Sequence, residues 1–167
     1  MSKTPPLLPA ETLARVLRIS RTDGILVLAV AAAFAMLSAL AKDLPGAMVG
    51  LLVASAGAAE LHGSGLLRAG EIRGISWLVG SQVHLITVVF FYVIWRLTFF
   101  DPAPLRVMIT PDLEQALRDL GYTFDEFARM ANRLSCALFA SLTLLYQGGM
   151  ALYYYRRRGL VEAALAE

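Results

Sequence analysis

The chain has 167 residues, of which 57% are hydrophobic and 17% are charged, and its mean hydropathy is +0.61. Soluble domains average about 45–50% apolar and about 25% charged residues, so this composition argues against a soluble domain. The net charge of +2 gives no reason to expect a nucleic-acid partner. Four apolar stretches instead indicate an all-α bundle of four transmembrane helices, in one membrane domain over residues 1–167, because each stretch is long enough to cross a bilayer, which takes about 20 residues.

The N-terminal segment is predicted to form an amphipathic helix over about 9–22. Leu13 and Val16 lie on one side of that helix, and Arg15 and Arg18 lie on the other. A basic polar face suits a helix that lies on an anionic membrane surface. An ordinary polar lead-in to the first span would give the same pattern, so both interpretations stay open.

The first two spans, about 24–41 and 45–67, are predicted to form a helical hairpin. Pro45 restarts the chain as a helix after a short turn that contains Lys42. Small residues before Lys42 resemble a signal-peptidase site, but the long basic leader favours a retained span.

The second span carries the clearest packing signal of the sequence. At about 100° per residue, Gly46, Gly50 and Gly57 fall on one narrow face, together with Glu60. Small residues allow two helix backbones to approach closely inside a membrane. We therefore expect this face to look into the bundle and to bring Glu60 with it.

The third span, about 75–100, is bulky and apolar on nearly all sides. Trp77 and Trp95 lie near its two ends, as expected for aromatic belts at the two membrane interfaces. One polar stripe runs along it and includes His84.

The segment 101–123 and the start of the fourth span, about 124–155, carry helix signals. Thr110 and the proline after it start a short amphipathic helix, which Gly121 ends. Thr123 then opens a capping box, so we expect the fourth span to begin near residue 124, outside the membrane.

The distribution of basic residues predicts the orientation. They cluster in the N-terminal segment, in the link between the second and third spans, and after the fourth span at Arg156, Arg157 and Arg158. Basic residues next to spans stay cytoplasmic. Both termini are thus expected in the cytoplasm, with 101–123 outside, in a multi-pass protein of the plasma membrane (the inner membrane of a Gram-negative cell). The three C-terminal arginines, with Arg15, Arg18 and the two tryptophans, are expected to anchor the helices in the lipid bilayer.

Three polar residues are predicted to meet inside the bundle. Counted from the cytoplasmic ends of their spans, Glu60, His84 and Gln147 lie at a similar depth. Ionisable residues inside a membrane are candidates for handling a proton or a cation. Two other interpretations stay open: Glu60 and His84 only hydrogen-bond to each other, or Glu60 lies at the interface beside Arg68 or Arg73.

No enzyme signature is present in the sequence. A haem held by His62 and His84 would require a helix tilt, and no motif for a phosphate, a dinucleotide or a nucleophile occurs. We therefore expect neither an enzyme nor a cofactor or metal site. The favoured interpretation is an oligomeric channel or transport component that passes a proton or a cation. The alternative is a non-catalytic scaffold or accessory subunit that binds another membrane protein through its Gly- and Ala-rich helix faces.

Overall fold

The computed structural model describes residues 8–166, which are all helical apart from their connections. The elements are α1 (Pro9–Leu40), α2 (Leu44–Arg68), α3 (Gly74–Thr98), the 3-10 helix η1 (Ala103–Met108), α4 (Pro111–Asp119) and α5 (Phe124–Ala166). The helices α1, α2, α3 and α5 are long and apolar enough to cross a membrane.

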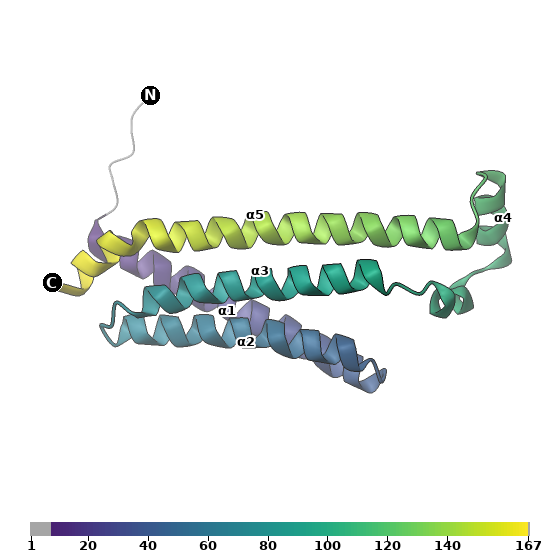
Figure 1. Cartoon of the computed structure of the whole chain (residues 1–167). Helices are drawn as coiled ribbons and strands as arrows, with labels where there is room; N and C mark the ends of the chain where they lie inside the picture. The colour runs from purple at the N-terminus through teal and green to yellow at the C-terminus, as the bar shows by residue number, and fades with distance from the viewer. Residues whose placement is uncertain (1–7, 167) are drawn as a thin grey trace, which may run out of the picture.

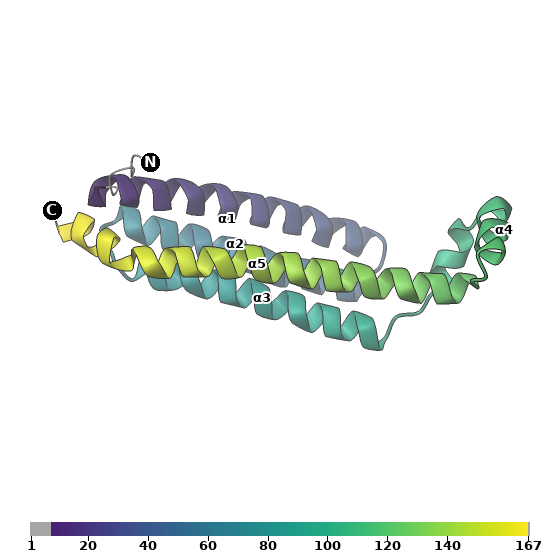
Figure 2. The same ribbon diagram turned by 90° about the horizontal axis from the view of Figure 1, so that it is seen from above.

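These four helices run side by side as a bundle (Figures 1 and 2). Each one contacts the next around a ring in the order α1, α2, α3, α5, and α5 closes the ring against α1. We call the end where α1 and α3 begin and α2 and α5 end the arginine end, and the opposite end the α4 end. Toward the α4 end, the α1–α2 hairpin tilts away from α3 and α5 (Figure 1).

The hairpin forms because its turn is well capped and its helices fit closely. The Asp43 side chain accepts a hydrogen bond of 3.1 Å from the Gly46 backbone nitrogen, which caps the start of α2. Further along α2, a Cβ placed on Gly50 would lie 2.8 Å from the Cβ of Ala35. A side chain there would push the two helices apart, so the glycine face lies against α1 within a single chain.

The predicted interfacial helix, 9–22, is the first part of α1 and continues into the span without a break. Its Val16 is fully buried in a cluster with Tyr154 and Val161 of α5. The apolar side of this segment therefore packs on the end of α5 and extends the bundle, while Arg15 and Arg18 remain exposed.

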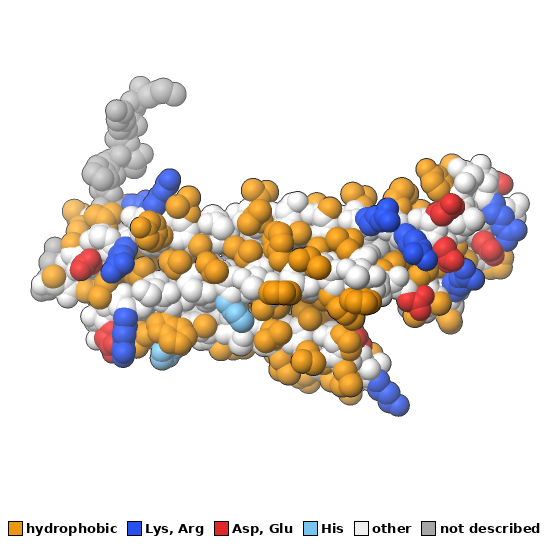
Figure 3. Space-filling view, viewed as in Figure 1, with side chains coloured by type: hydrophobic (Ala, Val, Ile, Leu, Met, Phe, Trp, Pro, Cys, Tyr) orange, Lys and Arg blue, Asp and Glu red, His pale blue; other side chains and the backbone are white. Residues whose placement is uncertain are grey.

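The core is narrow and consists of two clusters. One lies near the arginine end around Leu67, Leu78 and Tyr154, and the other lies nearer the α4 end around Leu85 and Val89. Hydrophobic side chains also cover the outside of the bundle, and charged side chains gather toward its two ends (Figure 3). A large apolar outer surface between charged ends fits a protein that is solvated by lipid.

The segment before α5 is ordered by helix caps. Thr110 caps α4 through the backbone nitrogen of Leu113, and Gly121 takes a positive φ of 79° just after that helix. The capping box predicted at Thr123 is present: the Glu126 backbone donates to the Thr123 hydroxyl, and the Thr123 backbone donates to the Glu126 carboxylate. These caps explain why α5 begins at Phe124.

Candidate functional site

A cluster of mostly buried polar side chains lies between the four long helices. Asp23 comes from α1, Glu60 from α2, Gln82 from α3, and Tyr146 and Tyr154 come from α5; we call these five residues the polar cluster. Glu60 and Gln82 are 2% and 1% exposed, and Asp23 is 7% exposed. The cluster lies about 12 Å inside the connection between α2 and α3, because Glu60 is eight residues from the end of α2.

Each carboxyl group in the cluster is held by a tyrosine. The Tyr154 hydroxyl donates a hydrogen bond of 2.7 Å to Glu60 Oε1. The Tyr146 hydroxyl donates one of 3.0 Å to Asp23 Oδ1. The two tyrosines are eight residues apart on α5, so one face of a single helix serves both acids.

Close helix crossing brings the two acids together. A Cβ placed on Gly57 would lie 2.7 Å from the Leu28 backbone nitrogen and 2.8 Å from the Gly24 carbonyl oxygen, so α1 and α2 almost touch there. Asp23 is next to Gly24 in the chain, and Glu60 is three residues after Gly57. The crossing thus places the Asp23 carboxyl group beside the Glu60 carboxyl group. The Gln82 side chain also lies next to the Glu60 carboxyl group.

The cluster has more polar atoms than internal partners. Asp23 Oδ2 and Gln82 Oε1 are buried and have no hydrogen-bond partner, and neither does the hydroxyl of Ser64, one turn from Glu60 on α2. No lysine, arginine or histidine among residues 8–166 pairs with Asp23 or Glu60. Two ionised carboxylates without a counter-ion are costly in a low-dielectric interior, so the site favours a bound proton or another ligand that removes the charge.

His84 is not part of this cluster, contrary to the prediction that it shares the interior with Glu60. Its Nε2 lies 3.1 Å from the Ser55 hydroxyl and 3.2 Å from the Leu52 carbonyl oxygen, in an outer groove between α2 and α3. The reason is the rotation of α3: Gln82 points inward, and His84 is two positions further, about 200° around the helix. The polar stripe of the third span is therefore its outer face.

Gln147 lies between all four helices but in a different environment. It lines an apolar groove of about 550 Å³ toward the middle of the bundle, with Val27, Val53 and Leu85 among its neighbours. Its Oε1 is buried and has no partner. Gln147 therefore makes no hydrogen bond to Glu60 or His84 in the described chain.

The other residues singled out in the sequence lie toward the two ends of the bundle. Trp77 and Trp95 are about half exposed toward opposite ends of α3, and Trp77 makes an edge contact with the ring of His62, with 4.8 Å between the centroids. Arg156, Arg157 and Arg158 follow Tyr154 on α5, at the arginine end. Gly46 lies against the Ser38 hydroxyl and Asp43 at the hairpin turn.

Sequence reasoning missed most of the polar cluster. Asp23 resembles one more polar residue before the first span, and only its contact with α2 shows that it is inside. Tyr154 lies on the same face of the fourth span as Gln147, and that periodicity was the available signal. Its place next to three arginines favoured a role at the membrane surface instead.

The geometry is the only basis for assigning a function. Comparisons with protein families, with curated proteins and with solved structures find no match to this chain. Within residues 8–166, no group of three or more His, Cys, Asp or Glu side chains is arranged to hold a metal ion.

Proposed function

We propose that the protein is a membrane transport component that passes protons, with Asp23 and Glu60 as the groups that hold the transported proton. One observation carries the proposal: two buried carboxyl groups from facing helices lie side by side without a basic partner, and each accepts a tyrosine hydrogen bond. Buried acids of this kind mark proton and ion pathways in membrane proteins.

The choice of a proton over a metal cation rests on the donors around the acids. A hard cation requires several oxygen atoms that are free to coordinate it, usually six or more. Here the two tyrosine hydroxyls direct their hydrogens at the carboxyl oxygens and occupy those positions. The order Tyr154, Glu60, Asp23, Tyr146 instead makes a string of groups that can all give or accept a proton.

The proposal includes a direction across the membrane. Basic residues dominate the arginine end, and such residues stay cytoplasmic next to spans. We therefore place both termini in the cytoplasm, α4 outside the plasma membrane, and the polar cluster nearer the cytoplasmic side. The basic residues at this end are Arg15, Arg18, Arg21, Arg68, Arg73, Arg156, Arg157 and Arg158.

The path beyond the cluster suggests how flux is controlled. Tyr146 is followed on α5 by Gln147, which lines the mostly apolar groove together with two other polar side chains, Tyr92 and Thr143. A dry apolar passage blocks protons, and a hydrated one admits them. Entry of water into this groove is thus the proposed gating step between the cluster and the α4 end.

Proton uptake by proteoliposomes tests the proposal. The unaltered chain should acidify vesicles that contain a pH-sensitive dye when a potassium diffusion potential is applied. Asp23→Asn and Glu60→Gln should each reduce that rate about tenfold or more, since each removes one group that takes up the proton. Glu71→Gln is the matched control, because Glu71 lies outside the bundle core and pairs with Arg73.

Two results would contradict the proposal. The first is no proton uptake by the unaltered protein, reconstituted in either orientation. The second is uptake that remains unchanged in the folded Asp23→Asn and Glu60→Gln variants. Either would favour the non-catalytic scaffold, with the polar cluster serving only to join four helices.

A further inference from the structure

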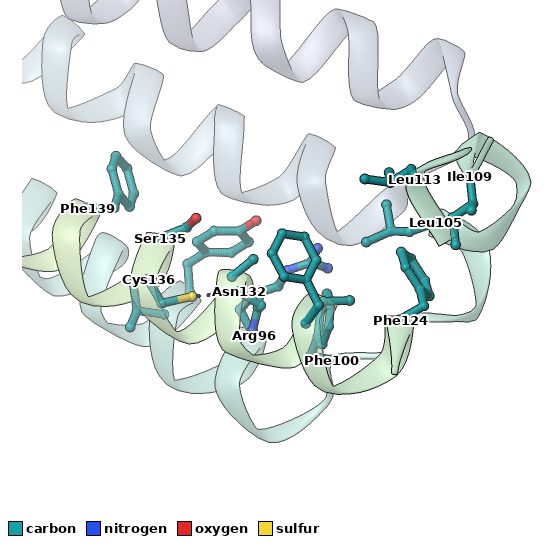
Figure 4. A pocket seen from close by; sticks show the side chains of 15 residues that line it. Arg96, Phe100, Leu105, Ile109, Leu113, Phe124, Asn132, Ser135, Cys136 and Phe139 are labelled. Carbon is teal, nitrogen blue, oxygen red and sulfur yellow. Dashed lines mark hydrogen bonds between the residues drawn. The ribbon is translucent and has the colours of Figure 1, made fainter. Parts of the chain in front are cut away.

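A second cavity lies at the α4 end, away from the polar cluster. It has a volume of about 520 Å³ and is lined by the end of α3, the start of α5, η1 and α4. Figure 4 shows Phe139 and Phe124 toward opposite ends of this cavity, with Arg96 between them. This volume falls within the range of about 300–1,000 Å³ that is typical of ligand pockets.

The walls of the cavity are apolar, with a single charged group. Phe100, Leu105, Phe124 and Phe127 are among the apolar side chains, and Arg96 is the only charged residue in the lining. Its guanidinium carbon lies 4.9 Å from the centroid of the Phe100 ring, which holds the cation against the wall.

Arg96 makes no salt bridge in the described chain. Arg106 pairs with Asp125, and Arg118 pairs with Glu114. Asn132 and Ser135 supply the polar atoms of the α5 wall beside Arg96. A cation, an amide and two hydroxyl groups (Ser135 and Tyr92) in an otherwise apolar pocket are complementary to an anionic head with an apolar tail.

We propose that this cavity binds a long-chain fatty acid, with the carboxylate on Arg96 and the acyl chain along the phenylalanine walls. The single cation, Arg96, matches the single carboxylate of a fatty acid, and the apolar walls match its single acyl chain. The bilayer supplies such molecules directly to a cavity between membrane helices. This proposal does not depend on proton transport, because none of its residues belongs to the polar cluster.

The natural tryptophans allow a direct binding test. The chain has two tryptophans, and Trp95 is next to Arg96, with its ring 6.3 Å from the ring of Tyr92 in the cavity wall. In a full-length Trp77→Phe protein in detergent, Trp95 is the single reporter. Dibrominated stearate should quench its fluorescence saturably, and the uncharged dibrominated octadecanol should bind about tenfold more weakly, since it lacks the charge-assisted hydrogen bonds to the guanidinium.

Substitutions then assign the site. Arg96→Gln should weaken the binding of dibrominated stearate about tenfold. Ala131→Phe should abolish the saturable quenching, because Ala131 lines the cavity and the added ring fills it. Arg133→Gln is the matched control: Arg133 lies on α5 but lines a different surface hollow.

Two outcomes overturn the proposal. Equal quenching by the acid and the alcohol in the unaltered cavity would show that no anion is recognised, whether or not the Arg96 variant folds. Tighter binding of dibrominated phosphatidylglycerol than of dibrominated stearate would show that the occupant is a phospholipid rather than a fatty acid.

Discussion

At the scale of single residues, the tyrosines on α5 decide how the buried acids are satisfied. Tyr154 is fully buried and donates to Glu60, whereas Tyr146 is 55% exposed and donates to Asp23. A hydrogen bond between two buried side chains costs more to lose than one whose donor side chain is exposed. Tyr154 should therefore contribute more to stability than Tyr146.

Tyr154→Phe should lower the free energy of unfolding in micelles by about 1–3 kcal/mol, because Glu60 Oε1 is buried and loses its hydrogen-bond donor. Tyr155→Phe is the control, since Tyr155 is exposed and makes no side-chain hydrogen bond in the described chain. Unfolding by a denaturing detergent, followed by circular dichroism, measures both. Equal stability of the two variants would mean that the Glu60–Tyr154 hydrogen bond is not formed in the folded protein.

The sequence allowed a prediction of Glu60 as a buried site residue but not of its partners. Glu60 shares a helical face with three glycines, and that face can only be an interior one. His84 was placed beside it because depth along a helix can be counted from the sequence. Rotation of α3 about its axis cannot be counted in this way, since that helix is apolar on nearly every side. The buried position of Asp23 depends on where α1 crosses α2. The sequence of one helix alone does not determine that crossing.

At the scale of elements, the hairpin of α1 and α2 depends on the absence of side chains at its crossing. Gly57→Leu should destabilise the fold by about 3 kcal/mol or more, because the new side chain would overlap the backbone of α1 at Gly24 and Leu28. Gly148→Leu on α5 should be nearly silent, since a Cβ there meets no other atom within 4 Å. The yield of monodisperse protein and its thermal stability compare the two. A stable Gly57→Leu protein would contradict the close crossing.

The caps at the α4 end make a separate prediction. Thr123→Ala should cost about 1 kcal/mol of local stability and speed amide hydrogen exchange in the first turn of α5 only. Thr110→Ala should do the same in α4 and leave α5 unaffected. Exchange that is unchanged in both variants would show that these caps do not hold the two helix starts.

Helix boundaries were accessible to sequence reasoning because local chemistry sets them. A proline, a capping residue or a glycine stands at the start or end of α2, α4 and α5, and each acts within one turn. The exception was the segment 9–22, because nothing in its sequence distinguishes a helix on the membrane surface from an extension of the first span. Its position is decided by packing on α5, more than 130 residues away.

At the scale of the whole molecule, the proposed orientation rests on the distribution of basic residues. In a Cys136→Ala background, a cysteine at Ala103 should react with a membrane-impermeant maleimide on intact cells, and a cysteine at Ala163 should react only after lysis. The first lies in η1 and the second near the end of α5, so they are on opposite ends of the bundle. Labelling of position 163 on intact cells would reverse the orientation and place the polar cluster nearer the outside.

The central claim is that Asp23 and Glu60 form one proton-holding site inside the bundle, and infrared spectroscopy tests it most directly. Exposed carboxyl groups lose their proton near pH 4. The carbonyl band of a protonated carboxyl group at pH 7 therefore has to come from a carboxyl group that is buried away from water. The protein in lipid vesicles should show that band at pH 7, and the Asp23→Asn/Glu60→Gln double variant should lack it. The Asp43→Asn control should keep it. Absence of the band from the unaltered, folded protein at pH 7 would contradict the account.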